Sequence, residues 1–129
     1  MPTPDDIEAG RTITRTRTFT REEVEQFADL SGDTGYHHLV AGQSGSVMVH
    51  GLLTATLPTA VGGDIDYVAR EMTFDFPEPV YTGEEITCEV TVDSVHEADG
   101  RTHLEVSWTC TNPDDEVVLT GSSSGVVFG

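Results

Sequence analysis

Residues 47–61 are apolar on nearly every side when they are drawn as a helix. A helix without a polar face is stable only inside a core, so other elements have to cover it all round. Gly62 and Gly63 are predicted to end this helix, and Pro58 is expected to kink it or to weaken its last turn. The chain is therefore expected to wrap its remaining elements around one long central helix.

The residues beyond this segment alternate as β-strands do. Met72, Phe74 and Phe76 form a first alternating run. Pro77 and Pro79 follow directly, and because proline cannot donate to a β-ladder they restrict this strand to a sheet edge or a turn.

Two longer runs, residues 86–92 and 104–110, place an apolar side chain at every second position. Both runs face the same side only if the loop between them, residues 98–100, has three residues with Gly100 in the left-handed conformation. This register sets Cys88 opposite Cys110. A disulfide is sterically feasible there, but two small buried thiols are more usual in a cytoplasmic domain.

A strand and a helix are predicted before the apolar segment. Threonine alternates with arginine, isoleucine and phenylalanine over residues 11–19, a pattern of period two that favours a strand. Thr20 and Glu23 then form a T-x-x-E capping box with Thr20 as the N-cap. The helix that they start is predicted to end at Gly32.

The order of elements predicts an α+β domain. Residues 31–46 read as a polar loop, residues 112–115 as a turn, and residues 117–120 as the start of a last strand. Strand, helix, loop, apolar helix and four strands fit one long central helix wrapped by a curved antiparallel sheet. We expect residues 1–129 to form a single domain, with residues 1–10 as a frayed acidic lead.

The charge balance excludes several partners. The chain has 23 acidic and 6 basic residues, all of the latter arginine, and a formal net charge of −17. Nucleic acid and anionic membrane surfaces are not expected as partners, because such a surface repels polyanions. No membrane-spanning run or signal pattern is present, so a cytoplasmic location is expected. The absence of lysine favours a halophilic origin over an acidic mesophilic protein.

Four of the six arginines lie in residues 11–21. This cluster has two interpretations. The arginines bind the phosphates of a nucleotide-bearing ligand, or they pair with nearby carboxylates, which is the more common arrangement.

Two short motifs carry residues suited to acid–base chemistry. Asp33 and His38 lie five positions apart in the polar loop, and a carboxylate and an imidazole in reach of one water can share general acid–base work. His50 and Gly51 stand where the loop meets the apolar segment, and a free N–H at Gly51 suits a developing oxyanion. Structurally, Asp33 can instead be a turn residue, His38 a surface side chain and Gly51 a close-packing position.

A metal site is not expected. His37, His38 and His50 are its candidate ligands, but adjacent histidines rarely bind one ion and no cysteine or carboxylate completes the set in sequence. Nucleophilic catalysis is not expected either, because no G-x-S-x-G motif is present.

Three segments resemble MaoC-like (R)-specific enoyl-CoA hydratases, which show an FTxxDVxxFAxLSGDxNPxH pattern followed by VHG. Residues 19–33 resemble the opening of this pattern, residues 49–53 (VHGLL) the second motif, and residues 76–84 (FPEPVYTGE) a further family segment. The resemblance covers residues 11–127. It implies the hot-dog fold, a homodimer and an acyl-CoA tunnel at the subunit interface.

The resemblance also implies roles for individual residues. Asp33 and His38 match the catalytic pair, the Gly51 N–H matches the donor to the thioester oxygen, and Thr59 matches, more weakly, a hydroxyl that supports the aspartate. Further substrate-binding positions are expected among the neighbours of these residues: Tyr36, His37 and His50.

This chain departs from the family pattern in one loop. Gly35 and Tyr36 replace Asn-Pro, His37 adds a second histidine, and the stretch between His38 and His50 is shorter than in typical bacterial members. The shortening trims the loop that lines the acyl tunnel.

The implied activity is the (R)-specific hydration of trans-2-enoyl-CoA, or the reverse dehydration of 3-hydroxyacyl-CoA. The substrate is a thioester of CoA or of acyl carrier protein, and no metal or redox cofactor is needed. Two alternatives remain: a hot-dog acyl-CoA thioesterase in which Asp33 directs water at the carbonyl, and a non-catalytic acyl-CoA-binding subunit.

The charge makes a first prediction about salt. Diluting KCl from molar to submolar concentration lengthens the Debye length from about 3 Å towards about 10 Å, so repulsion among the carboxylates grows. Thermal unfolding followed by circular dichroism is expected at lower temperature in dilute KCl, with weaker acyl-CoA binding by calorimetry. Tightest binding at low salt would contradict this expectation.

Overall fold

The computed structural model describes residues 7–42 and 45–127. The elements, in chain order, are β1 (Thr12–Thr18), α1 (Arg21–Ser31), α2 (Tyr36–Leu39), α3 (Gly51–Thr54), α4 (Thr56–Asp64), β2 (Tyr67–Asp75), β3 (Glu85–Ala98), β4 (Arg101–Thr111) and β5 (Val117–Val127).

The expected acidic lead is only partly covered by these residues. Its residues 1–6 lie outside the described part of the chain. Ile7 packs against the core, and the Gly10 N–H donates to the Val92 carbonyl at 2.7 Å. Residues 7–10 are therefore tied to the fold and are not frayed.

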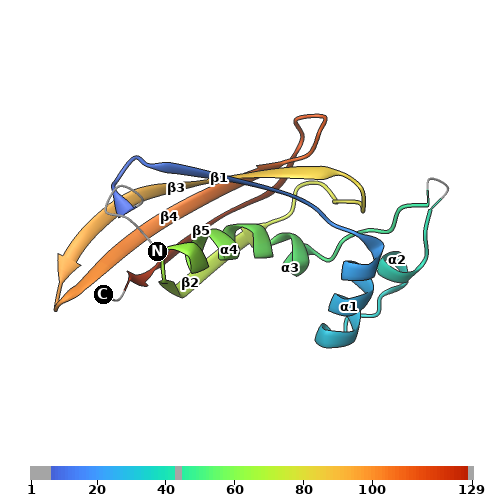
Figure 1. Ribbon diagram of the computed structural model, residues 1–129, viewed down its shortest axis with the longest axis horizontal. Coiled ribbons are helices and arrows are strands. Elements are labelled where there is room, and N and C mark those ends of the chain that lie inside the picture. The colour runs from blue at the N-terminus through green and yellow to red at the C-terminus, as the bar shows by residue number, and fades with distance from the viewer. Residues whose placement is uncertain (1–6, 43–44, 128–129) are drawn as a thin grey trace.

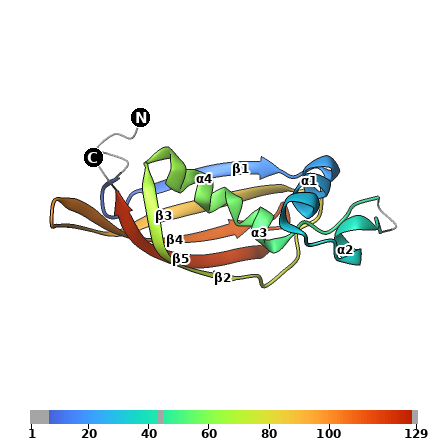
Figure 2. The ribbon, with the colours of Figure 1, turned by 90° about the horizontal axis from the view of Figure 1, so that it is seen from below.

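Five antiparallel strands form one sheet in the order β1-β3-β4-β5-β2. The sheet curves over α3 and α4, while α1 and α2 lie beyond one end of it and the β3–β4 hairpin forms the other end (Figures 1 and 2). The predicted α+β class and the antiparallel sheet are confirmed. β2 lies at an edge, as the prolines after it require.

The predicted pairing of β3 with β4 is confirmed, but the predicted loop is wrong. Cys88 lies opposite Cys110, whereas the turn has only two residues, Asp99 and Gly100, both with positive φ. The additional residue is absorbed in a bulge between Val92 and Ser94. A two-residue turn of this kind matches the twist of the strands, and the bulge keeps both apolar faces on the same side.

The predicted long central helix is replaced by two short helices. Residues 47–50 lie outside any helix, α3 ends at Thr54, and α4 continues through Gly62 and Gly63 to Asp64. The cause is Pro58, which has no N–H for the Thr54 carbonyl and whose ring crowds that carbonyl. The helix is thus interrupted at Ala55, about one turn before the proline, and it continues past the proline. Among the described residues, no helix is both long and apolar enough to cross a membrane.

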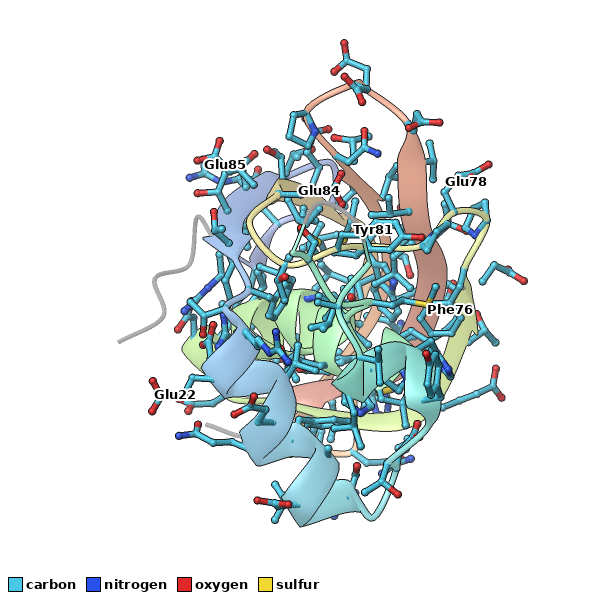
Figure 3. The ribbon with its side chains drawn as sticks, turned by 90° about the vertical axis from the view of Figure 1, so that its right-hand side faces the viewer. Glu22, Phe76, Glu78, Tyr81, Glu84 and Glu85 are labelled. Atoms are coloured by element: carbon cyan, nitrogen blue, oxygen red, sulfur yellow. The ribbon has the colours of Figure 1, made fainter. Side chains whose placement is uncertain are left out.

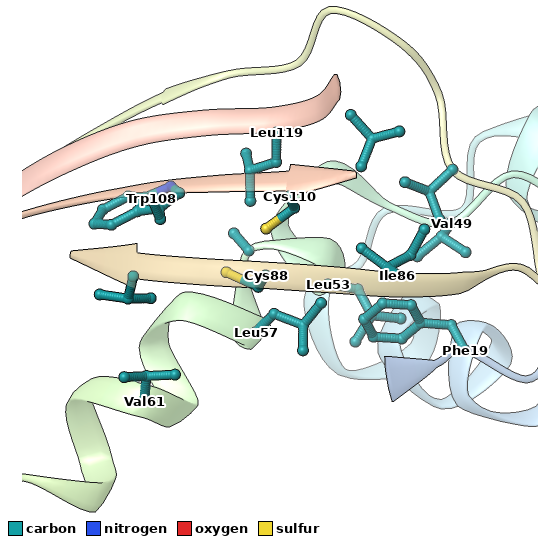
Figure 4. Packing of buried hydrophobic residues seen from close by; sticks show 14 of the residues in the cluster. Phe19, Val49, Leu53, Leu57, Val61, Ile86, Cys88, Trp108, Cys110 and Leu119 are labelled. Carbon is teal, nitrogen blue, oxygen red and sulfur yellow. The ribbon is translucent and has the colours of Figure 1, made fainter. Parts of the chain in front are cut away.

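The core lies between α4 and the concave face of the sheet. Leu57 and Val61 of α4 face the inward side chains of β3 and β4, including Cys88, Cys110 and Trp108 (Figure 4). Both cysteines are free and fully buried. The hydrogen bond with the Cys88 thiol, together with burial, raises the pKa of the Cys110 thiol, which therefore stays protonated.

The predicted capping box is present at the start of α1. The Glu23 N–H donates to Thr20 Oγ1 at 3.1 Å, and the Thr20 N–H donates to Glu23 Oε1 at 2.9 Å. Arg17 also binds the Glu23 carboxylate. The hydrogen bond from the Thr20 backbone, followed by the Arg17 guanidinium, lowers the pKa of Glu23. Gly32 ends the helix in the left-handed conformation, as predicted.

This box generates a second prediction. Replacing Glu23 by Ala is expected to lower the free energy of unfolding by about 1 kcal/mol at pH 7. Because the pKa of Glu23 is lowered in the folded state, the contribution is complete above the ordinary glutamate pKa of about 4.3 and disappears as the pH falls through the folded value. Urea unfolding of the variant and the wild type at pH 7 and at a pH below the ordinary glutamate pKa measures this.

The control is Glu22→Ala, which changes an exposed acid of the same turn that lies outside the box. Its effect is expected to be smaller than that of Glu23→Ala. A Glu23→Ala effect that stays constant down to acid pH would exclude the ionised carboxylate as its source.

Candidate functional site

The candidate site is built by the connection between α1 and α3. Gly32 turns the chain out of α1 and brings Asp33 to the surface, where the Asp33 N–H donates to Ser31 Oγ at 3.1 Å. The expected polar loop then contains the short helix α2, and the chain returns to the start of α3 at Gly51. Residues from both ends of this connection meet at the same end of the molecule (Figures 1 and 2).

The structure brings Asp33 and His38 together, as the spacing suggested. His38 Nε2 lies 3.7 Å from Asp33 Oδ2. The two side chains have contrasting environments, since His38 is 5% exposed and Asp33 is 56% exposed. The pair therefore joins a solvent-facing carboxylate to a buried imidazole.

A second contact determines which nitrogen of His38 carries the proton. His38 Nδ1 lies 2.7 Å from the Met48 carbonyl oxygen. Because a carbonyl oxygen only accepts, Nδ1 has to be the protonated nitrogen. In the neutral ring, Nε2 is then a free base directed towards the Asp33 carboxylate.

His50 is buried behind this pair and is only 2% exposed. Its Nε2 lies 2.9 Å from the Asp33 carbonyl oxygen, so Nε2 carries the proton. Its Nδ1 is enclosed, and no hydrogen-bond partner for it is found within the described residues. His50 also lines the hollow beside Asp33, so the expectation that it contacts the substrate stays a prediction.

Four aromatic rings form a column through the site. The imidazoles of His38 and His50 stack with their centroids 3.7 Å apart and their planes 16° from parallel. His37 packs on the outer side of His38 at 3.9 Å, and Phe27 of α1 on the inner side of His50 at 4.9 Å. Sequence reasoning missed Phe27, because its place in the apolar stripe of α1 only indicated packing.

Two hollows meet at Gly51. One, of about 320 Å³, is lined by Asp33, and the other, of about 470 Å³, is lined by His38 and Thr54. Gly51 and Phe76 line both. A Cβ atom on Gly51 would lie 2.8 Å from the Phe76 ring, so only glycine leaves the start of α3 open beneath this ring.

Phe76 follows β2 and lies at the rim of this end of the molecule, where the acidic side chains of Glu22, Glu78 and Glu85 point outward (Figure 3). Its side chain is 47% exposed. The alternation that contains Phe76 predicted only a strand, so nothing in the sequence indicated its position over Gly51.

Of the other predicted substrate-binding residues, only His37 lies at the site. His37 lines the larger hollow, whereas Tyr36 lines a separate surface hollow and is 77% exposed. Thr59 is not brought to the pair: its hydroxyl donates to the Thr56 carbonyl of its own helix at 3.0 Å. Thr54, one turn nearer to Gly51, is the buried hydroxyl residue of the site.

The ligand atoms of Asp33, His38 and His50 lie within 4.8 Å of one another. A metal ion bound by imidazole lies close to the plane of the ring, and two nearly parallel stacked rings cannot both contain the same ion in their planes. The stacking is therefore poorly suited to a shared metal ion, and metal-free chemistry stays a prediction.

The arginine cluster near β1 is engaged with carboxylates. Arg15 binds Asp64 at 2.9 Å, and Arg17 binds Glu23. A third arginine of the cluster, Arg21, lies 3.4 Å from Glu25. These pairs agree with the more common of the two interpretations, in which the arginines pair with nearby carboxylates.

Comparison with known proteins identifies relatives of this chain among dehydratases. The family model for the FAS1-like dehydratase domain region matches residues 12–121. The 3-hydroxybutyryl-CoA dehydratase of Methylorubrum extorquens is 31% identical over 130 residues, covering 92% of this chain and 80% of that protein. The mitochondrial 3-hydroxyacyl-[acyl-carrier-protein] dehydratase FERN of Solanum lycopersicum is 25% identical over 130 residues, covering 94% and 78%.

The fold is also that of solved hydratases. The (R)-hydratase from A. caviae involved in PHA biosynthesis aligns with a TM-score of 0.83 and 24% identity over 95% of this chain and 97% of that one. The chain therefore belongs to the FAS1-like dehydratase family and has the hot-dog fold of the MaoC-like (R)-hydratases.

Proposed function

We propose that this protein is an (R)-specific enoyl-CoA hydratase, which in reverse is a 3-hydroxyacyl-CoA dehydratase. The observation that carries the proposal is the facing pair of acceptors, His38 Nε2 and Asp33 Oδ2, 3.7 Å apart. One water molecule can donate a hydrogen to each of them. Its remaining lone pair is then directed away from both groups and towards a bound substrate.

The reaction follows from this arrangement. The water oxygen bonds to the β-carbon of the enoyl thioester while one of its O–H bonds transfers a proton to the Asp33/His38 pair. The π electrons of the double bond move into the thioester and form an enolate. The pair then returns a proton to the α-carbon, and the carbonyl re-forms. No metal or redox cofactor takes part in this mechanism.

The Gly51 N–H is the proposed donor to the enolate oxygen. Gly51 is the first residue of α3, so its N–H has no partner within the helix. A preorganised donor of this kind contributes roughly 3–4 kcal/mol to stabilising a developing oxyanion. The apolar lining of the larger hollow, which includes Val49, Val80 and Val118, suits an acyl chain.

The names of the relatives support a thioester substrate on either of two carriers. The M. extorquens relative is named for a CoA thioester, and the tomato relative for one of acyl carrier protein. We propose acyl-CoA or acyl carrier protein thioesters as substrates, with no nucleic acid or membrane partner, and a cytoplasmic, halophilic setting, as the acidic lysine-free composition favours.

A homodimer is part of this proposal. Large apolar side chains remain exposed at the site: Leu52 is 62% and Phe76 47% exposed. Leu52 and Phe76 line the hollow that contains Asp33. Exposed apolar side chains gathered at one place mark an interaction surface, and a second copy that covered them would also enclose the hollow.

A third prediction tests the pair in molar salt. Asp33→Asn and His38→Gln are each expected to lower kcat for hydration of crotonyl-CoA by about 100-fold or more, because each replaces a group that can take up a proton from the water by an amide that cannot. Loss of the conjugated double bond is followed by ultraviolet absorbance. Asp29→Asn serves as the control, since Asp29 is an exposed acid of α1.

The same samples distinguish the alternatives. Release of free thiol without loss of the double bond indicates the thioesterase, and binding without either reaction indicates a non-catalytic subunit. Sedimentation checks that each variant keeps the oligomeric state of the wild type. Hydration at the wild-type rate in both variants would overturn the assignment of the pair.

A fourth prediction concerns Gly51. A methyl group at Gly51 meets the Phe76 ring, which is half-exposed and able to move, so Gly51→Ala is expected to fold. The displaced ring then narrows the hollows, and kcat/KM is expected to fall by about tenfold or more. Steady-state kinetics and thermal unfolding measure the two effects.

Gly63→Ala is the matched control, because nothing lies within 4 Å of a Cβ atom at Gly63. The double variant Gly51→Ala, Phe76→Ala is expected to recover part of the activity. Wild-type kinetics in Gly51→Ala would indicate that the thioester does not bind at Gly51.

A further inference from the structure

We propose that His50 is a positioning residue, which holds Asp33 and His38 in their facing arrangement without touching the substrate. The inference rests on the proposed function and differs from the substrate-binding role that the sequence suggested for His50. It is carried by three contacts of one buried residue, two made by its ring and one by its backbone.

The first contact holds the main chain of Asp33. The Nε2–H of His50 donates to the Asp33 carbonyl oxygen at 2.9 Å. The carboxylate itself is 56% exposed, and its Oδ1 accepts only the Gly35 N–H among the hydrogen bonds of the described residues, at 3.2 Å. The position of the carboxylate therefore depends on where the backbone of Asp33 is held.

The second contact holds the ring of His38. His50 stacks on it at 3.7 Å, almost parallel, while the Met48 carbonyl oxygen accepts from its Nδ1 at 2.7 Å. The hydrogen bond restrains one edge of the His38 ring, and the stack restrains one face. Together they keep Nε2 directed at Asp33.

The third contact connects His50 to α3. His50 is the N-cap residue of this helix, and its carbonyl accepts the Thr54 N–H at 3.0 Å. The next residue is Gly51, the proposed donor to the enolate oxygen. His50 thus links the carboxylate, the imidazole base and the oxyanion donor through a single side chain and its own backbone.

The unpartnered Nδ1 indicates why the residue is an imidazole. A phenyl ring at this place would stack on His38 and on Phe27 without leaving a buried nitrogen unsatisfied. An imidazole has the free-energy cost of a buried, unpaired Nδ1, but it adds one hydrogen bond, from its Nε2–H to the Asp33 carbonyl oxygen. The hydrogen bond is therefore the feature that distinguishes histidine from an apolar ring here.

Three substitutions separate the ring from the hydrogen bond. His50→Phe keeps the stack and removes the donor, His50→Gln keeps an N–H donor and removes the ring, and His50→Ala removes both. His103→Phe is the control, because His103 is a partly buried histidine of β4, outside the site, whose Nε2 also has no partner among the described residues. All are assayed with crotonyl-CoA in molar salt after their folding is checked by circular dichroism.

For His50→Phe and His50→Ala we expect kcat to fall by about 10- to 100-fold while KM changes by less than about threefold, since the reacting groups are displaced and the binding surface is not. His50→Gln is expected to recover much of the kcat lost in His50→Ala. A rise in KM at unchanged kcat would instead identify His50 as a substrate contact. Wild-type kinetics in His50→Phe would show that the hydrogen bond has no role. Either result overturns the proposal.

A measurement without substrate separates this inference from the proposed hydratase activity. Nitrogen-15 NMR of the histidine rings is expected to show the proton on Nδ1 of His38 and on Nε2 of His50 in the wild type. In His50→Ala, which removes the stacked ring, the His38 ring is expected to populate both tautomers. If the wild type proves inactive but the tautomers change in this way, the proposed function fails and the positioning role stands. If His38 keeps one tautomer in every variant, the positioning role fails whatever the activity.

Discussion

The packing of α3 and α4 against the concave face of the sheet is the interaction on which the rest of the structure depends. It buries the apolar side chains of residues 53–61, and it fixes where α3 begins. Because Pro58 cannot bond the Thr54 carbonyl, the helix breaks at Ala55, while its first turn remains anchored by the Thr54 and Ala55 N–H groups. Gly51 consequently stands at the end of the core, where the connection from α1 returns.

The site combines two environments that one surface could not offer. The carboxylate of Asp33 is open to solvent, whereas His38 and His50 are buried in a column of rings. Burial orients the imidazoles, since each has one N–H donating to a backbone carbonyl. The strong negative charge of the chain takes no part in this arrangement. Of the acids, Asp33 alone is assigned a chemical role, and those that rim this end point outward (Figure 3).

Much of the fold was predictable because its local signals agree with its tertiary contacts. The capping box of α1, the edge position of β2 and the pairing of Cys88 with Cys110 all follow from residue type and spacing. The turn between β3 and β4 was not predictable, because a three-residue loop and a two-residue turn with a bulge produce the same alternation of apolar side chains. Only the twist of the strands chooses between them.

The sequence by itself determined the α+β class, the family and the approach of Asp33 to His38, since each rests on a motif or a period within a short stretch of chain. Tertiary structure alone decided the rest of the site. It buried His50 behind the pair, set the Phe76 ring over Gly51, and kept Thr59 away on α4. These outcomes depend on how segments distant in sequence pack together, and no local pattern of residue types contains that information.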